Sequence, residues 1–209
     1  MSEVGRRQAR EKARVRRDLI ATALRLFEQQ GVEQTTVQQI ADAAGVTRRT
    51  FHRHFLSKWA VVGAEEDDVL TWLLAAVESR PPAESVLTAM RSALRALLLE
   101  QLSPEQVEAA FRARHLLNSN AQLRQRSFLG AQQRQLLLAR AFAARSGCPE
   151  EDLGPQLAAG ACLAAINVSL DRWARLGDRS AIALHEIMDG ALATLGSGID
   201  LPADQRRRL

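Results

Sequence analysis

The sequence is poor in the residue types from which most catalytic and metal-binding sites are built. Its 209 residues include no tyrosine, only two cysteines and only four histidines. Cys148 and Cys162 do not form a CxxC pair, and no GxSxG, HExxH or glycine-rich phosphate-binding sequence is present. Two isolated cysteines fit a reducing compartment, so we expect a cytoplasmic location. Nothing in the sequence indicates an enzyme, a bound metal or another cofactor.

Long apolar runs are also missing. No uninterrupted apolar segment approaches the ~20 residues that cross a bilayer, and no apolar stretch of a signal peptide follows the charged N-terminus. We therefore expect no membrane partner. Hydrophobic residues make up 46% of the chain, and most of them are alanine and leucine with few β-branched runs. This composition favours an all-α protein.

Positive charge is concentrated at one end of the chain. Residues 1–60 contain 12 Lys and Arg against 6 Asp and Glu, a net of +6, whereas residues 61–209 contain 16 against 18, a net of −2. Because phosphate neutralisation with release of counterions dominates affinity for nucleic acids, a basic end is typical of a DNA-binding head. A basic N-terminal tail that serves only solubility has the same composition.

Residues 35–58, TTVQQIADAAGVTRRTFHRHFLSK, have the organisation of two short helices joined by a glycine turn. Thr36 and Gln39 fit a capping box at the start of the first helix. Gly45 stands where this helix should end in a backbone conformation with positive φ. The layout is that of a helix-turn-helix, whose second helix enters the major groove of DNA.

The second helix of this motif carries most of the residues that we expect to contact DNA. Thr47 can cap it, and Phe51 and Phe55 should face the core, so the polar side chains between them point outward. Arginine can donate bidentate hydrogen bonds to O6 and N7 of guanine, and threonine can contact a base or a thymine methyl group. A lysine after the cap residue Ser57 can meet a phosphate. The predicted DNA-contacting residues are Thr36, Thr47, Arg48, Arg49, Thr50, His52, Arg53, His54 and Lys58.

From Val15 to Trp59 the sequence resembles the N-terminal domain of the tetracycline-repressor (TetR) family of regulators. The resemblance rests on an amphipathic first helix that stops at Gly31, on the helix-turn-helix, and on the closing sequence FHRHFLSK. His52 and Arg53 stand where the family usually has tyrosines, and Trp59 where an acidic or polar residue is common. These departures leave the expected fold unchanged and alter the expected contacts to DNA.

The resemblance implies an all-α protein in which a three-helix helix-turn-helix DNA-binding domain precedes a helical ligand-binding and dimerisation domain. We place the DNA-binding domain at residues 15–58 and the helical domain at residues 59–198. A basic arm, residues 1–14, and a basic tail, residues 199–209, flank them. The partners implied are a double-stranded DNA operator, a second copy of the chain and a small-molecule effector.

The basic arm has few apolar residues before Leu19, so we expect roughly its first dozen residues to be disordered in the free protein. Two roles remain open for it. Its arginines can enter the minor groove beside the major-groove helix, where the negative potential favours them. The arm can instead make only weak, nonspecific phosphate contacts.

Beyond Lys58, apolar periodicity predicts a series of helices over about 57–78, 83–102, 103–117, 121–145, 155–176 and 179–195. Ser103 and Pro104 fit a cap and a first helical position. The last two helices combine small residues with apolar stripes, which suits a four-helix bundle made by two chains. By resemblance, TetR-like proteins dimerise through this pair; the alternative is that the two helices bury each other within one subunit.

By resemblance, the central helices enclose an effector cavity. Asn167 lies in line with Leu163 and Leu170, so it should face inward and bond either a ligand or a neighbouring helix. The region from residue 114 through residue 178 is similar to an effector domain of actinobacterial type, some members of which respond to acyl thioesters or other lipophilic metabolites. We therefore expect a lipophilic or acyl-type effector, with candidate contacts Trp72, Phe111, Arg114, His115, Asn118, Phe128, Leu163, Asn167 and Asp171.

Together these features predict a homodimeric repressor that a small, largely apolar ligand releases from a palindromic operator. The alternative is a helical ligand-binding or protein-interaction module that has lost specific DNA binding. Arg48, Arg49, Thr50 and Lys58 argue against this alternative, because a decayed motif would not need to keep them.

Overall fold

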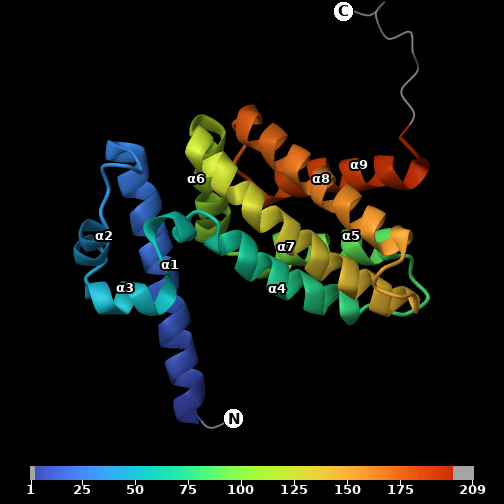
Figure 1. The fold of residues 1–209 in the computed structure, drawn as a ribbon, viewed down its shortest axis with the longest axis horizontal. Coiled ribbons are helices and arrows are strands. Elements are labelled where there is room, and N and C mark those ends of the chain that lie inside the picture. Colours follow the sequence, from blue (N-terminus) through green and yellow to red (C-terminus); the bar gives the residue numbers. More distant parts are fainter. Residues whose placement is uncertain (1–2, 200–209) are drawn as a thin grey trace, which may run out of the picture. The chain divides into compact units, whose positions relative to one another are not determined.

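The structure, a computed structural model, describes residues 3–199, except for the side chains of residues 3, 4, 9, 65, 126, 128 and 129. The predicted basic tail therefore lies outside the described residues apart from Ile199. Residues 3–199 are largely helical and contain no strand, which confirms the all-α prediction (Figure 1). In chain order the elements are α1 (Glu3–Gln30), α2 (Val37–Ala43), α3 (Arg48–His54), η1 (Lys58–Val61), α4 (Ala64–Glu78), α5 (Val86–Ala96), η2 (Leu97–Gln101), α6 (Pro104–Ser119), α7 (Ala121–Ser146), α8 (Leu153–Leu176) and α9 (Ala181–Ser197).

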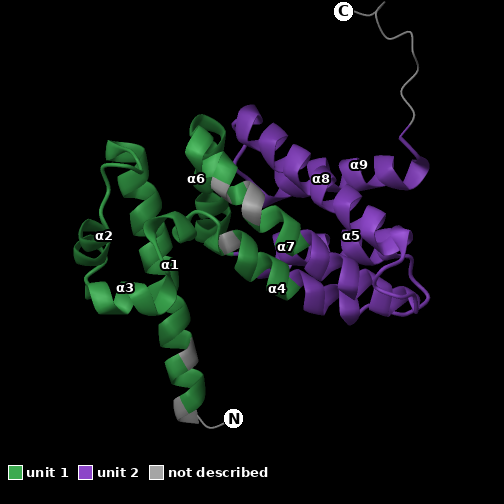
Figure 2. Cartoon of the chain, viewed as in Figure 1, with its two compact units in different colours: residues 1–72, 103–134 green, residues 73–102, 135–209 purple. Residues whose placement is uncertain are grey.

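The chain divides into two compact units (Figure 2). Unit 1 comprises residues 1–72 and 103–134, and unit 2 comprises residues 73–102 and 135–209. This division differs from the predicted domain boundary at residue 58, because α6 and the first part of α7 group with the N-terminal helices. Sequence patterns could not indicate this grouping, since the segments that pack together are far apart in the chain.

Unit 1 is built around a single core. The helix-turn-helix contributes Ile40, Phe51 and Phe55 to it, and α6 contributes Leu116 and Leu117, all of them buried. α1 packs against α2, the 3₁₀ turn η1 and α6. Burying a leucine contributes about 1.5–3 kcal/mol, so α6 is an integral part of the head that holds the helix-turn-helix.

α1 is longer at its N-terminal end than the sequence predicted. Residues 3–14 are helical, whereas we expected a disordered arm over residues 1–14. Arg14 braces this part by ion pairs with Glu11, at 2.7 Å, and with Asp18, at 3.1 Å. The segment contains no proline and continues a helix that the core anchors from Leu19 onward. The helix therefore extends toward the N-terminus without the cost of forming a new helical nucleus. The prediction of a disordered arm considered only the shortage of apolar residues and not this extension.

Capping residues begin several helices where the sequence placed them, but two predicted helices differ. Ser103 caps α6 in a capping box with Gln106, as its position before Pro104 predicted. The predicted helix over 57–78 is interrupted: Ser57 caps only the 3₁₀ turn η1, and α4 begins at Ala64, after a glycine that favours helix poorly. The predicted helix over 83–102 begins at Val86 and ends in the π-helical η2, where Leu102 N donates to Leu97 O at 3.0 Å.

Unit 2 is built around the pair α8 and α9, with α5 and η2 packed against α9. Its fully buried side chains include Met90, Leu138, Phe142, Trp173 and Leu192. α8 ends at a glycine in the left-handed conformation, with φ +77°, between the two predicted helices. The predicted existence and order of the last two helices are thus confirmed.

Arg145, at the end of α7, closes the loop between α4 and α5 within unit 2. Its Nη1 donates to the carbonyls of Val77 at 3.2 Å and Arg80 at 3.0 Å. Its Nη2 donates to the carbonyl of Glu84 at 3.0 Å and also to that of Pro81. One guanidinium thus bonds one carbonyl of the last turn of α4 and three carbonyls of the loop that follows it.

α8 is the one helix within residues 3–199 that is long and apolar enough to cross a membrane by length and composition. Its most apolar 18-residue window has a mean hydropathy of 1.4 and is 28% buried. The prediction concerned uninterrupted apolar runs, and it stands, because polar residues such as Gln156 and Asn167 interrupt the apolar sequence of α8. Core helices of soluble proteins pass the same test, so a single helix of this kind is weak evidence for a membrane span.

Candidate nucleic-acid interface

The first helix of the motif begins and ends as the sequence predicted. Thr36 Oγ1 accepts from Gln39 N at 3.2 Å, and Gln39 Oε1 accepts from Thr36 N at 2.8 Å. Gly45 has φ +67°, and Val46 N donates to Ala41 O at 2.9 Å. The capping box and the glycine turn are therefore confirmed, and together they fix the direction in which the chain enters α3.

α3 is held by its apolar face, which leaves its first turn in solvent. Thr47 Oγ1 accepts from Thr50 N at 3.1 Å, and Phe51 and Phe55 are 0% and 4% exposed. Arg48 and Arg49 are exposed, and within residues 3–199 neither guanidinium has a hydrogen-bond or ion-pair partner. Two free cations at the start of a rigid, capped helix can reach an acceptor on another molecule without first breaking an internal bond.

The three residues that follow Phe51 differ in exposure. His52 and Arg53 are exposed, as expected. His54 was expected to face outward, but it is half-buried, and its Nδ1 is buried without a hydrogen-bond partner. Burial, and then the nearby cations Arg16, Lys12 and Arg53, lower the pKa of this imidazole. His54 thus lies beneath the surface that its neighbours form.

Lys58 is bound internally. Its Nζ donates to the carbonyls of Glu33 and Thr35, both at 2.9 Å, and lies 5.2 Å from the ring centroid of Trp59. This lysine therefore clamps the loop before α2, a position that the sequence motif alone did not indicate. Its predicted contact with a DNA phosphate would have to use the remaining proton of the ammonium group.

Arg16 is a residue of this site that sequence reasoning missed, because it is absent from the predicted DNA-contacting residues and lies outside the helix-turn-helix. Its guanidinium pairs with Asp68, with Nε to Oδ2 at 2.8 Å, and donates to the carbonyls of His54 at 3.3 Å and Ala64 at 3.4 Å. It also lies 4.7 Å above the ring of Phe55. Arg16 thereby fixes the end of α3 against α1 and α4. A single arginine that joins segments this far apart in the chain leaves no local signal.

The predicted effector contacts in unit 1 differ in burial. Phe111 is buried, His115 is exposed, and the other described ones are half-buried: Trp72, Arg114 and Asn118. The side chain of Phe128 lies outside the described residues. Their role in ligand binding remains a prediction.

Asn167 differs from the expected inward orientation among the candidates in unit 2. Its side chain is exposed, and its Nδ2 donates to Leu163 O on the preceding turn at 3.0 Å. Leu163 and Asp171 are half-buried. Asn167 does lie one helical turn after Leu163, as its spacing indicated. Its side chain is nevertheless exposed, because this face of α8 is only partly covered within one chain.

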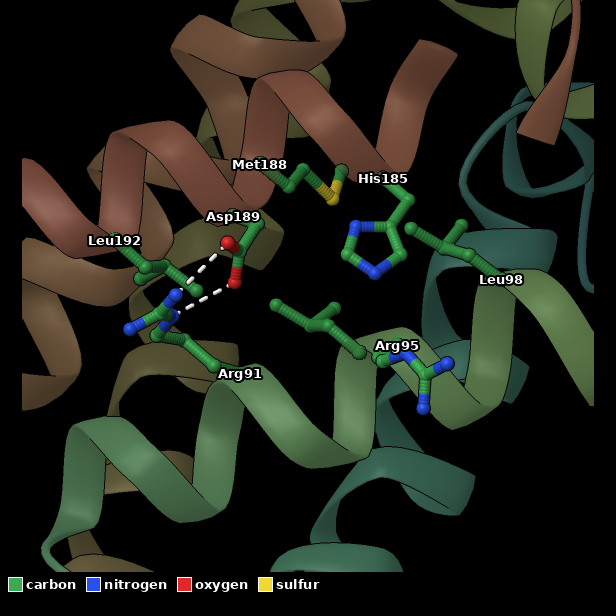
Figure 3. A pocket seen from close by; sticks show the side chains of 8 residues that line it. Arg91, Arg95, Leu98, His185, Met188, Asp189 and Leu192 are labelled. Carbon is green, nitrogen blue, oxygen red and sulfur yellow. Dashed lines mark hydrogen bonds and ion pairs between the residues drawn. The ribbon is translucent and has the colours of Figure 1, made fainter. Parts of the chain in front are cut away.

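A shallow cleft between α5 and α9 in unit 2 is lined by other residues (Figure 3). Arg91 and Asp189 form a bidentate ion pair across it at 2.7 and 2.8 Å, and this hydrogen bonding lowers the pKa of Asp189. Arg95 and His185 lie at its other end, with Leu98 nearby. None of the predicted effector contacts lines this cleft. The ion pair in its lining joins α5 to α9.

The cysteines do not form a reactive pair. Burial raises the pKa of the Cys162 thiol to about 12, while Cys148 is half-buried in the loop after α7. In the described part of the chain, His, Cys, Asp and Glu side chains nowhere gather in a group of three that would suit a metal ion.

Two family models match the chain. Residues 19–64 match the model described as bacterial regulatory proteins, tetR family, and residues 84–200 match the MftR C-terminal domain. The first match spans the helix-turn-helix, and the second spans most of the remaining helices. A curated relative, the HTH-type transcriptional regulator TcmR of Streptomyces glaucescens, is 35% identical over 204 residues, which cover 95% of this chain and 89% of the relative.

Solved structures share the fold at lower identity. FadR of Thermus thermophilus, a TetR-family transcriptional repressor in complex with lauroyl-CoA, has a TM-score of 0.51 and 23% identity, with 90% of this chain and 96% of that chain covered. A complex of SmeT, the repressor of a Stenotrophomonas maltophilia multidrug efflux pump, with triclosan has a TM-score of 0.55 and 21% identity, with 93% and 98% covered. These two likenesses concern the arrangement of the helices.

Proposed function

Because the chain belongs to the TetR family of DNA-binding transcriptional regulators, which are not enzymes, we propose that it is a homodimeric repressor that a small, largely apolar ligand releases from a palindromic operator. The observation that carries the proposal is the first turn of α3. There, Arg48 and Arg49 stand free in solvent on a helix whose other face is fixed by Phe51 and Phe55. A regulator that binds DNA acts where the DNA is, so we propose that the protein is located in the cytoplasm.

In this proposal α3 reads bases and its neighbours position the duplex. Arg48 and Arg49 reach guanine edges, Thr50 contacts a base or a thymine methyl group, and Thr36 and Thr47 bond phosphates. His52, Arg53 and Lys58 add contacts to the backbone, and His54 supports α3 from beneath. The unpaired guanidinium groups of Arg48 and Arg49 favour DNA binding over the alternative of a helical module without it. In that alternative, the two groups would have no binding partner.

Dimerisation through α8 and α9 is supported by the apolar side chains that a single chain leaves exposed. On α8, Leu153, Leu157, Val168 and Leu176 are 60–70% exposed, and on α9 Ile182 is 63% exposed. Large apolar side chains exposed in this number are expected at an interaction site, and a two-fold axis covers the same surface on both chains. A two-fold dimer presents two α3 helices to major grooves about 34–36 Å apart, which calls for a palindromic operator.

A lipophilic or acyl-type effector is supported by the largely apolar material of the central helices, with arginines interspersed. FadR of T. thermophilus was solved with lauroyl-CoA, which carries an apolar acyl chain on a polar anionic head, and SmeT was solved with triclosan. We propose that the effector contacts Trp72, Phe111, Arg114, His115, Asn118, Phe128, Leu163, Asn167 and Asp171. It must bind the DNA-free conformation more tightly than the DNA-bound one, since only a difference in affinity shifts the equilibrium.

The operator test is binding of the purified protein to sheared genomic DNA from its own source, followed by sequencing of the bound fragments. Recovery of a palindrome is the expected result, and the genes beside it indicate the effector class. Salt-sensitive binding without an enriched site would contradict the proposal and favour the module without specific DNA binding. Isothermal titration with acyl-CoA species and free fatty acids tests the effector, and an absence of heat would exclude the acyl class.

Arg49→Ala tests the division of labour between head and body. Removing one bidentate base contact should weaken operator binding by about 1–3 kcal/mol per half-site while leaving the effector affinity of the DNA-free protein unchanged. Arg25→Ala, which removes another exposed arginine of unit 1, is the matched control in anisotropy titrations. Equal loss of both affinities in Arg49→Ala would contradict the assignment.

A further inference from the structure

A cleft of about 610 Å³ lies between the N-terminal part of α1 and α3, within unit 1. In Figure 1 this part of α1 extends well past α3 toward the N-terminus. One wall of the cleft comes from α1 and the other from α3, and the lining residues are Gly5, Gln8, Glu11, Lys12, Val15, Thr50, Arg53 and His54. The α1 residues recur at helical spacing, so they form one stripe of the helix.

The cleft holds positive charge that the chain does not neutralise. Lys12 and Arg53 are exposed, and among the described residues neither has a hydrogen-bond or ion-pair partner. The only lining carboxylate, Glu11, is already engaged by Arg14, with Oε1 2.7 Å from Nη2. Behind the cations, burial and then the charges of Arg16, Lys12 and Arg53 lower the pKa of His54, so the positive charge of the cleft comes from Lys12 and Arg53. The cleft therefore suits a bound anionic group.

The position of the cleft selects the anion. Thr50 belongs both to the cleft wall and to the first turn of α3, which the proposed function assigns to base reading. A duplex read by α3 must pass the mouth of the cleft. Residues 3–14 form a helical segment about 18 Å long, at about 1.5 Å per residue, which equals the length of roughly five base pairs.

The helical state of this segment also decides between the two roles open to a disordered arm. A helix with side chains is about 10–12 Å across, whereas the minor groove is only about 6 Å wide. Residues 3–14 therefore cannot enter the minor groove without unfolding. As a helix, they can follow the sugar-phosphate backbone beside the half-site.

We propose, on the basis of the DNA-binding function proposed above, that the operator backbone occupies this cleft, with one phosphate between Lys12 and Arg53 and residues 3–14 of α1 along the flanking backbone. The N-terminal part of α1 is then a second DNA-contacting element. It positions the duplex and adds affinity and salt dependence without reading sequence.

The test compares Lys12→Ala with Arg10→Ala in the full chain. Arg10 is exposed on the same helical segment but lies about half a turn away from the cleft stripe, so both variants lose one charge and only one loses the proposed contact. Affinity for the recovered operator is measured by anisotropy between about 50 and 200 mM salt. One phosphate contact per subunit should make the slope of log K against log salt shallower by about 1.8 per dimer in Lys12→Ala alone.

Hydroxyl-radical footprinting on the same duplex provides a second readout. Wild-type protein and Lys12→Arg should protect roughly five base pairs of backbone outside each half-site, and Lys12→Ala should lose this protection. Unchanged slopes and footprints, or equal slope changes in Lys12→Ala and Arg10→Ala, would overturn the cleft proposal. If wild-type protein does not prefer the operator over a scrambled duplex, the proposed function fails instead. Helical content by circular dichroism confirms that the variants are folded.

Discussion

At the scale of single residues, His54 couples the DNA-binding head to pH. The imidazole is half-buried near Lys12, Arg16 and Arg53, so its pKa lies below the ordinary value of about 6.5. The unfolded chain therefore binds this proton more tightly than the folded chain. Acidification through the ordinary pKa should lower the free energy of unfolding, and stability should return as the pH rises above it.

His54→Gln removes this titration. Between about pH 7.5 and 5.5, the wild-type protein should lose more stability than the variant, measured by urea denaturation followed by circular dichroism. His52→Gln, at an exposed position of α3, is the control and should follow the wild-type curve. A variant that loses as much stability on acidification as the wild type would contradict the assignment to His54.

The two cysteines should differ in reactivity, because the thiolate is the reactive form. Burial raises the pKa of Cys162 to about 12, whereas Cys148 is half-buried in a loop. Titration of the native protein with a chromogenic disulfide should show one fast thiol, and a second only after unfolding. Cys148→Ser should remove the fast phase. Two fast thiols in the native protein would show that the core around Cys162 opens readily.

At the scale of elements, local chemistry explains what could be predicted from the sequence and what could not. Thr36, Thr47 and Ser103 cap helices where their spacing indicated, because a cap bonds to a backbone N–H only a few residues away. The bonds of Arg16 and Lys58 were not predictable, since both join segments that are distant in the chain. The same limit applies to α6, whose core partners lie in α1.

Arg145 offers a test of how much one such distant contact contributes. Its guanidinium bonds four carbonyls in and after the last turn of α4. Arg145→Ala leaves these carbonyls without that partner and should lower the free energy of unfolding by about 2–3 kcal/mol. Urea denaturation is the measurement.

Arg140→Ala is the matched control for Arg145→Ala. Arg140 also lies on α7, but it pairs with Glu150 where both side chains are about 60% exposed. Loss of such a pair should cost about 0–1 kcal/mol. Similar effects of the two substitutions would mean that the bonds of Arg145 add little stability.

At the scale of the whole molecule, the exposed surface of α8 should determine the oligomeric state. Leu157 is 61% exposed in one chain, and in the proposed dimer it is covered by the partner. Leu157→Glu should therefore shift the mass measured by light scattering from that of a dimer toward the 23.0 kDa of one chain. Leu136→Glu changes a leucine of α7 that is 54% exposed, and it should leave the mass unchanged. A monomeric wild type would contradict the proposed dimer.

The participation of α6 in the core of unit 1 limits how this regulator can be recombined with others. A chimera joined at residue 58 would combine a head from one protein with an α6 selected to fit another. Leu116 and Leu117 would then meet foreign side chains of α1, with the loss of stability that poor packing brings. Interchangeable sensor and reader modules built on this scaffold must therefore exchange α6 and the start of α7 together with the reader.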